Sequence, residues 1–137
     1  MVSWNNLDTL SSYKELADVK PACLTEVMSG DNGAERVKNY SVPMAAGLSY
    51  NYASKQVNEN VLAALEKLAD EAQLADKFKA LYNGEVVNTG EKRLVLHHMT
   101  RGQLGDAVEA DGVDKRTFYK TQQERIAEFA NKVHNGE

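Results

Sequence analysis

The sequence has very little cysteine and no long hydrophobic run. Its single cysteine, Cys23, cannot form a disulfide within the chain, and an unpaired thiol suits a reducing compartment. We interpret Cys23 as a small apolar residue beside Leu24 and Val27 rather than as a nucleophile. No run of about 18 apolar residues predicts a transmembrane helix, and the opening MVSWNNLDTL does not resemble a signal peptide. We therefore expect a cytoplasmic protein without a membrane partner.

An excess of positive charge is also missing. The chain has 16 basic and 20 acidic residues, a formal charge of -4, and its basic residues are scattered among acids. Because nucleic-acid surfaces usually need a clustered basic patch, we expect no nucleic-acid partner. The 42% of hydrophobic and 26% of charged residues are ordinary for a globular protein, and 137 residues fit one domain.

The spacing of apolar residues predicts a mainly helical chain. One helix is expected over residues 7–16 and a shorter one near 22–28, which a turn at 29–33 ends. The longest predicted helix has Asn58 as its N-cap and an apolar stripe of three- and four-residue steps that continues to Tyr82.

Three features frame the second half of the chain. Gly84 is a plausible left-handed stop for the long helix, and a final helix is expected to begin between 114 and 117 and to end at 135–136. Residues 93–101 form either a short buried helix or a strand, because the run Leu94-Val95-Leu96 fits both. Residues 102–111 are expected to form a loop.

Residues 40–52 differ from the helical segments. They contain aromatic and β-branched residues and are interrupted by Pro43 and Gly47, which predicts a short extended hairpin or an edge strand. We see no internal repeat and no low-complexity linker. The fold class is therefore mainly α, with one domain or part of one.

The titratable residues form no evident catalytic or metal site. His97 and His98 are adjacent, so in a helix their side chains diverge by about 100° and do not readily share a metal. We expect one ring to be buried with a hydrogen-bond partner and the other to face solvent. Asp70 and Glu71, with lysines nearby, are expected to form a solvated helix face with ion pairs rather than a catalytic pair.

Phosphate-binding and hydrolase motifs are missing as well. The glycine-containing segment 29–33 lacks the Lys-Ser/Thr ending of a P-loop, and no G-x-S-x-G is present. Arg93 and Arg101 flank the apolar run at 94–96. They either bridge carboxylates at an interface, or one of them faces a polar cavity.

The longest distinctive motif is NGEVVNTGEKRLVLHHMTR, from Asn83 to Arg101. It resembles the pattern N-G-E-x-x-N-x-T-E-x-R-A-V-L-H-x-A-L-R of the glucose-6-phosphate isomerase family. The departures are Gly90 for Thr, Leu94 for Ala, and Met99-Thr100 for Ala-Leu. These departures suggest a divergent bacterial-type branch.

Weaker similarities to the same family occur in the same order along the rest of the chain. They are Trp4-x-x-Leu7, Glu35-Arg36-x-x-x-Tyr40-Ser41, Tyr52-Ala53-Ser54-Lys55 with Asn51 where Asp is usual, and the tail from Glu128-Phe129 to His134-Asn135-Gly136-Glu137. The resemblance therefore covers essentially the whole chain.

The resemblance implies an N-terminal helical segment, residues 1–137, of a larger α/β sugar-isomerase-type protein. The resemblance implies that the full-length protein interconverts glucose 6-phosphate and fructose 6-phosphate in glycolysis and gluconeogenesis, without a cofactor and as a homodimer. Its catalytic groups lie downstream, so no catalytic residue is expected here, and the sugar phosphate would bind only to the full-length enzyme. Arg93 and His97 are candidate second-layer residues, which would position the active-site residues of the full-length enzyme without contacting the substrate. The alternative is a free-standing helical protein-interaction module without catalysis.

Overall fold

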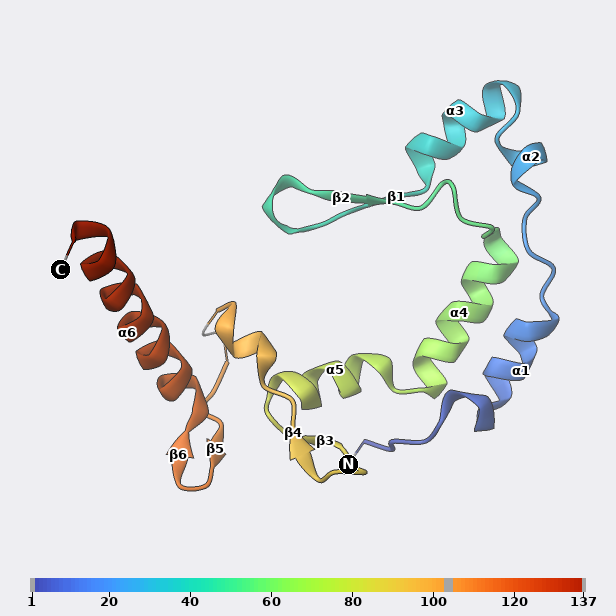
Figure 1. Ribbon diagram of the computed structural model, residues 1–137. Helices are drawn as coiled ribbons and strands as arrows, with labels where there is room; N and C mark the ends of the chain where they lie inside the picture. The colour runs from blue at the N-terminus through green and yellow to red at the C-terminus, as the bar shows by residue number, and fades with distance from the viewer. Residues whose placement is uncertain (1, 103–104, 137) are drawn as a thin grey trace. The chain divides into compact units, whose positions relative to one another are not determined.

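The computed structural model describes residues 2–102 and 105–136, and it is mainly helical (Figure 1). Helices make up 56% of the structure, and the described strands form short antiparallel pairs. The chain divides into two compact units. One consists of Asn5–Ala72 and the other of Met1–Trp4 together with Gln73–Glu137. The prediction of a mainly helical chain is confirmed.

The first unit contains helices and one β-hairpin, which projects from the end of the helix that precedes it in Figure 1. Its elements are η1 (Leu7–Thr9), α1 (Ser11–Asp18), α2 (Leu24–Val27), α3 (Gly30–Asn39), β1 (Ser41–Pro43), η2 (Ala45–Gly47), β2 (Ser49–Asn51) and α4 (Glu59–Glu71). The helix predicted over 7–16 is present as a 3-10 turn followed by α1. The short helix predicted near 22–28 corresponds to α2, with Cys23 exposed just before it.

The turn predicted at 29–33 is wrong for most of its length, because α3 already begins at Gly30. The sequence suggested a turn because this segment has two glycines. At Gly33, however, the glycine serves a close contact: a Cβ there would lie 2.4 Å from the carbonyl oxygen of Met28. Because Gly33 has no side chain, the backbone at the end of α2 can lie directly against α3, and α3 remains a continuous helix.

The hairpin predicted at 40–52 is confirmed. Strands β1 and β2 pair antiparallel, with Val42 opposite Tyr50, and the amide of Tyr52 donates to the carbonyl of Tyr40 at 2.9 Å. The rings of Tyr40 and Tyr52 lie 5.2 Å apart. These contacts close the base of the hairpin next to α3.

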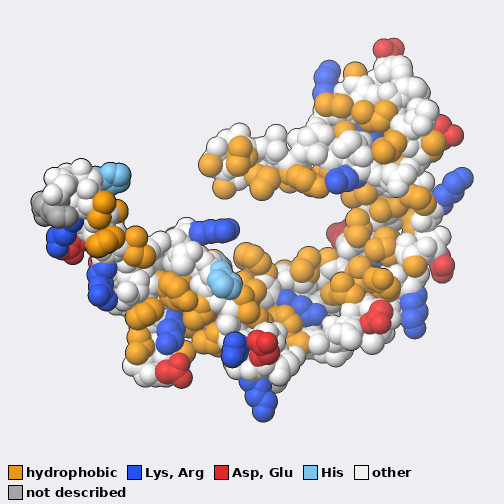
Figure 2. Space-filling view, in the orientation of Figure 1, with side chains coloured by type: hydrophobic (Ala, Val, Ile, Leu, Met, Phe, Trp, Pro, Cys, Tyr) orange, Lys and Arg blue, Asp and Glu red, His pale blue; other side chains and the backbone are white. Residues whose placement is uncertain are grey.

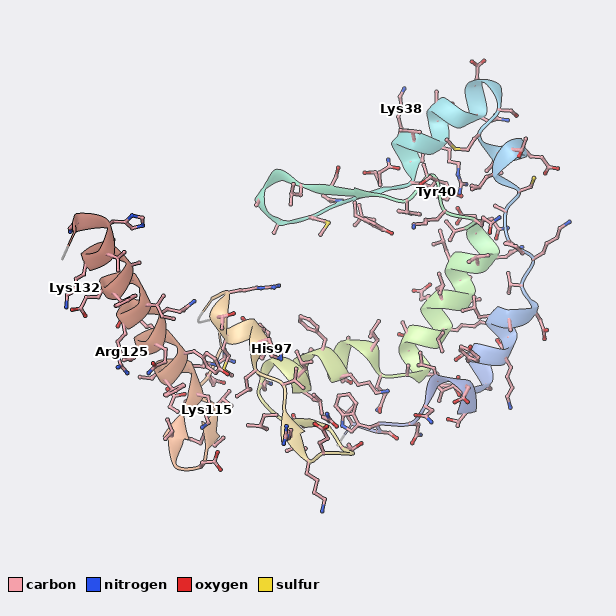
Figure 3. All side chains as sticks on the ribbon, viewed as in Figure 1. Lys38, Tyr40, His97, Lys115, Arg125 and Lys132 are labelled. Atoms are coloured by element: carbon pink, nitrogen blue, oxygen red, sulfur yellow. The ribbon has the colours of Figure 1, made fainter. Side chains whose placement is uncertain are left out.

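Buried Arg36 fixes the chain that leaves the hairpin. Its Nε donates to the carbonyl of Ala53 at 2.7 Å, and its Nη2 donates to the carbonyls of Lys55 at 3.0 Å and Val57 at 2.8 Å. The guanidinium also lies 3.9 Å from the centre of the Tyr40 ring, which Figure 3 labels. One side chain of α3 therefore holds the segment that leads into α4.

Glu71, at the end of α4, caps the start of α1. One carboxylate oxygen accepts hydrogen bonds from the amide of Ser11 at 3.2 Å and from its hydroxyl at 3.0 Å, and the other accepts from the amide and hydroxyl of Ser12. Residue Leu10, at the N-cap of α1, offers no side-chain acceptor, so Glu71 takes that role. Glu71 is exposed, as the prediction of a solvated face requires, but its carboxylate binds serine donors of α1 instead of forming the predicted ion pairs.

These hydrogen bonds favour the charged carboxylate of Glu71. Led by the bond from the Ser12 hydroxyl, they lower the pKa of Glu71 from 4.5 to about 2. Nearby, the Lys67 ammonium lies 3.5 Å from Glu15, so the ion pair of this surface joins α4 to α1. The sequence spacing predicted ion pairs within one helix, whereas Lys67 pairs with a glutamate on a different helix.

The long helix predicted from Asn58 to Tyr82 is present as two helices. Its N-cap is confirmed, since the Asn58 side chain accepts from the amide of Val61 at 3.0 Å. The helix is interrupted at Gln73, which adopts a left-handed φ of 55°, and it continues as α5 (Leu74–Tyr82). The Gln73 side chain accepts from the amide of Ser3 at 2.9 Å, a distant contact that periodicity does not reveal.

The second unit carries the remaining elements. They are α5, β3 (Val86–Asn88), β4 (Arg93–Leu94), η3 (His97–Thr100), β5 (Glu109–Ala110), β6 (Val113–Asp114) and α6 (Lys115–Asn135). Residues 93–101 contain both of the conformations that the sequence left open, a short strand followed by a 3-10 helix. The left-handed stop at Gly84 is confirmed by its φ of 73°.

The loop predicted at 102–111 is wrong at its C-terminal end. Residues 103 and 104 lie outside the described residues, but 109–114 form a hairpin whose turn is Asp111-Gly112, with φ of 54° and 71°. An Asp-Gly pair with two positive φ angles is a favoured two-residue hairpin turn. The final helix is confirmed, with Asp114 as its N-cap and Gly136 as its left-handed end.

Few large apolar side chains are buried within either unit. The buried apolar residues are mostly alanines, with Met99 and Val108 in the second unit. Large apolar side chains remain exposed along the β1–β2 hairpin, where Figure 2 shows them as a continuous row, and on α6. No helix within the described ranges is both long and apolar enough to cross a membrane.

Candidate functional site

The motif from Asn83 to Arg101 packs around the C-terminal end of α5. The carbonyl of Tyr82 accepts a hydrogen bond from Nη2 of Arg116 at 2.8 Å and lies 3.1 Å from Nε2 of His98. The Tyr82 ring also stacks on His98, with 4.9 Å between ring centres, and lies 5.2 Å from the Arg116 guanidinium. Tyr82 thus joins η3 and the start of α6 to α5.

The two histidines divide as the sequence predicts. The His98 ring is half-buried and has the Tyr82 carbonyl as its partner, whereas His97 is exposed on η3 (Figure 3). In the part of the chain that the structure describes, neither ring bonds to a hydroxyl, a thiol or a carboxylate. These histidines therefore do not form the nucleophile–base pair that covalent catalysis uses.

Gly84 lies close against the side chain of Val108. A Cβ at this position would lie 2.2 Å from Cγ1 of Val108, which is buried, and the φ of 73° independently favours glycine. The Asn83-Gly84-Glu85 part of the motif therefore serves packing and a helix end.

Arg93, the first candidate for supporting an active site, lies on β4. Its side chain is 76% exposed and comes within 3.9 Å of Glu91. Together with residues of the β5–β6 hairpin it lines a polar hollow of about 540 Å³; the charged lining residues are Lys92, Arg93, Glu109, Asp111 and Lys115. The polar-cavity reading of Arg93 thus matches the structure, while Arg101 is simply exposed.

The structure does not bring the two candidates Arg93 and His97 into one arrangement. Arg93 belongs to the polar hollow and His97 to the exposed side of η3, and they share no interaction among the described residues. Both side chains are accessible to groups outside this unit.

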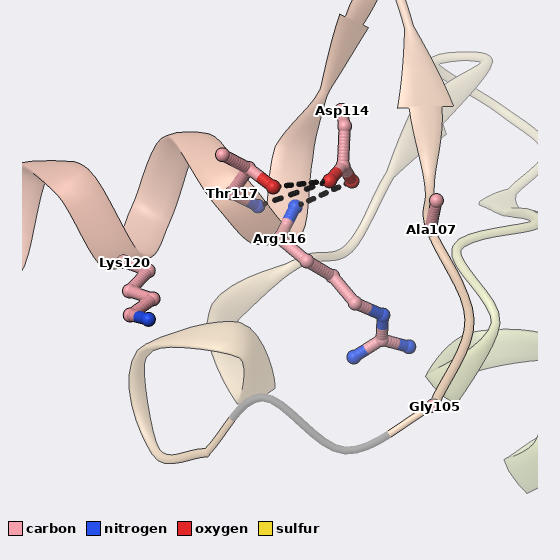
Figure 4. Close-up of a pocket in the computed structure, with 6 residues that line it drawn as sticks. All are labelled: Gly105, Ala107, Asp114, Arg116, Thr117 and Lys120. Carbon is pink, nitrogen blue, oxygen red and sulfur yellow. Dashed lines mark hydrogen bonds between the residues drawn. The ribbon is translucent and has the colours of Figure 1, made fainter.

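A second cavity lies at the start of α6 and was not predicted. It measures about 240 Å³ and is lined by Gly105, Ala107, Asp114, Arg116, Thr117 and Lys120 (Figure 4). Arg116 is only 5% exposed. Its Nε donates to the carbonyl of Asp106, and a Cβ on Gly105 would lie 2.9 Å from its Nη2. Nothing in the local sequence separates this buried arginine from the exposed ones.

Asp114 holds the first turn of α6 in place. Its carboxylate accepts from the amides of Val108 at 3.2 Å, Arg116 at 3.1 Å and Thr117 at 3.3 Å, and from the Thr117 hydroxyl at 2.5 Å. These bonds, the Thr117 hydroxyl first, lower the pKa of Asp114. A carboxylate held in its charged form by four donors is suited to helix capping and poorly suited to accepting a proton.

The described residues contain no group of three or more His, Cys, Asp or Glu side chains that could hold a metal ion. What the second unit offers instead is positively charged hydrogen-bond donors in two polar cavities. This arrangement can bind and position a negatively charged group.

The sequence of the chain is similar to that of known sugar-phosphate isomerases. A family model described as phosphoglucose isomerase matches residues 51–137. The chain is 44% identical over 98% of its length to a glucose-6-phosphate isomerase of Treponema denticola, and 41% identical over 99% to one of Borreliella afzelii. It covers 27% and 25% of these two relatives, so it spans about a quarter of the length of the curated relatives that it matches.

Proposed function

The chain belongs to the phosphoglucose isomerase family, and on this premise we propose that it forms the N-terminal quarter of a glucose-6-phosphate isomerase. Such an enzyme interconverts glucose 6-phosphate and fructose 6-phosphate. The observation that carries the proposal is the 44% identity over nearly the whole chain to a relative of that name. The whole protein would be a cytoplasmic homodimer of larger α/β architecture, without a nucleic-acid partner.

Residues 1–137 would act in that protein as one helical segment that does no chemistry alone. Moving a proton between two sugar carbons through an enediol needs a positioned base and groups that stabilise the developing charge. The hydrogen-bonded carboxylates described above, Glu71 and Asp114, are committed to capping helices, and their lowered pKa values make them poor bases. In this proposal the proton transfer is carried out by residues outside this chain, without a cofactor.

In the whole enzyme Arg93 and His97 would contact and position active-site residues without contacting the substrate themselves. Their exposure supports this role, because an exposed guanidinium and an exposed imidazole can reach carboxylates or carbonyls of a neighbouring part of the protein.

A chimera tests the proposal. The matching region of the Treponema denticola enzyme is replaced by this chain, and fructose 6-phosphate turnover is measured by coupling glucose 6-phosphate formation to NADPH production. We expect turnover of the same order as the parent from the chimera and none from the 137-residue chain alone. Turnover by the chain alone would refute the division of roles.

The chimera also tests Arg93. Arg93→Ala is expected to lower kcat by about tenfold, since small displacements of catalytic groups are costly. The matched control is Lys92→Ala, which removes a neighbouring charge from the same hollow. An Arg93→Ala chimera with normal kcat and lowered melting temperature would show a purely structural role. A well-folded chimera without activity would instead favour the interaction module.

A further inference from the structure

We propose that the cavity at the start of α6 is a binding site for a small phosphate-type oxyanion, held by Arg116 and Lys120. This inference does not depend on the proposed isomerase function. It rests on the hydrogen bonding, burial and charge of the residues that line the cavity in Figure 4.

Arg116 has an unused donor in a buried position. Its Nε and Nη2 bond to the carbonyls of Asp106 and Tyr82, but among the described residues Nη1 has no hydrogen-bond partner although the atom is buried. A buried polar group without a partner is costly, so a native structure normally supplies one from protein, water or a bound ion. The cavity beside Arg116 has room for that partner.

The charge of Arg116 also lacks a counter-ion in the described part of the chain. The carboxylate nearest to it in the sequence is that of Asp114, the N-cap of α6, which bonds to the backbone amide of Arg116 and not to its guanidinium. That carboxylate already accepts from four donors. A buried guanidinium satisfied only by neutral carbonyls and an aromatic ring is a favourable place for an anion.

Lys120 adds a second positive charge to the same cavity. It lies four residues after Arg116, one helical turn away, so the two side chains share a face of α6. Like charges at this spacing repel each other, and an anion between them removes the repulsion. The only described partner of Lys120 is Glu124, at 4.0 Å on the exposed side of the helix.

The charges lining the cavity favour a compact oxyanion over a larger ligand. Arg116 and Lys120 against Asp114 leave one net positive charge, in a volume of about 240 Å³. The α6 amides that could bind an anion are those of Arg116 and Thr117, and Asp114 already occupies them, so side chains must hold the ligand. Phosphate oxygens suit this arrangement because one accepts from Arg116 while another faces the Lys120 ammonium.

The test is a titration of the 137-residue chain with inorganic phosphate at constant ionic strength, followed by amide chemical shifts. Gly105 and Ala107 report on the cavity, and Gly33 in the other unit reports on unspecific effects. We expect saturable shifts at Gly105 and Ala107 only. A parallel titration with glycerol 3-phosphate shows whether the site prefers a phosphate monoester or free phosphate. Acetate, a planar anion, is the control for binding of any small anion.

Two variants provide a matched comparison. Lys120→Gln should weaken phosphate binding by about threefold, the effect of one exposed charge. Lys132→Gln should leave it unchanged, because Lys132 also pairs with a glutamate on α6 but lies away from the cavity. Both positions are exposed, so both variants should fold, which Arg116→Ala is not expected to do.

The proposal fails if phosphate produces no saturable shift beyond that of sodium chloride. It also fails if Lys120→Gln and Lys132→Gln behave alike, or if acetate binds as tightly as phosphate. The first result would leave the Arg116 Nη1 atom satisfied by water alone.

Discussion

Replacing Gly84 by alanine tests whether the family motif serves packing at this position. The added methyl group meets two separate obstacles. The backbone φ of 73° disfavours any residue with a Cβ, and that Cβ would lie 2.2 Å from Cγ1 and 3.1 Å from Cγ2 of Val108. Val108 is 4% exposed and cannot move aside into solvent without opening the core of its unit.

The two obstacles have different magnitudes. A left-handed conformation costs a residue with a Cβ about 1 kcal/mol relative to glycine. Forcing a methyl group into a packed position costs about 1–3 kcal/mol more. Gly84→Ala should therefore lower the free energy of unfolding by about 2–4 kcal/mol, a large share of the stability of a domain of this size.

Urea unfolding followed by circular dichroism measures the loss, and two variants separate its causes. Gly112→Ala has a similar φ of 71° but open space around its Cβ, so it should lose only about 1 kcal/mol. In the double variant with Val108→Ala, the clash disappears and the effect of Gly84→Ala should shrink to the conformational part. Equal losses from Gly84→Ala and Gly112→Ala would refute the packing argument.

Three further predictions follow from other contacts. Arg36→Met should lower the free energy of unfolding by about 3 kcal/mol, because three carbonyls, including that of buried Ala53, lose their donor, whereas Lys38→Met on the same helix should have little effect in thermal melts. Glu71 contributes stability above pH 4.5 that is lost as the pH falls toward 2, since folding lowers its pKa. The stability difference between the wild type and Glu71→Gln in urea titrations at successive pH values should therefore vanish across that range. The isolated chain should be marginally stable or self-associate, and Phe129→Glu should reduce the association seen by light scattering, unlike Lys132→Glu.

The local features of the fold were predictable from sequence because they depend on neighbouring residues. The Asn58 cap, the Gly84 stop and the start of α6 at Asp114 each involve a side chain and backbone groups within a few positions. The split of His97 and His98 was also predictable, because adjacent residues on a helical turn point in different directions.

The features that were missed depend on contacts between distant residues. Gln73 interrupts the long helix while bonding to Ser3, and Glu71 caps a helix sixty residues earlier in the chain. No apolar spacing encodes either contact. Arg116 was missed for the same reason, since its partners Tyr82 and Asp106 come from other segments.

The apolar face of α6 connects these observations to the proposed longer protein. Ile126, Phe129 and Val133 follow helical spacing and predict a buried face, yet they are 67%, 69% and 58% exposed, and no described segment of their unit covers them. Because these side chains are already partly covered, burying the remainder would stabilise the protein by about 1–2 kcal/mol for each. The apolar pattern of α6 predicts a buried face, but the described part of its own unit does not cover that face. The proposed longer protein accounts for this, because the remaining three quarters of the enzyme would supply the covering surface. In the chimera these three side chains should become protected, and footprinting of Phe129 by hydroxyl radicals measures that protection. Equal labelling of Phe129 in the isolated chain and in an active chimera would show that α6 stays uncovered in the whole enzyme.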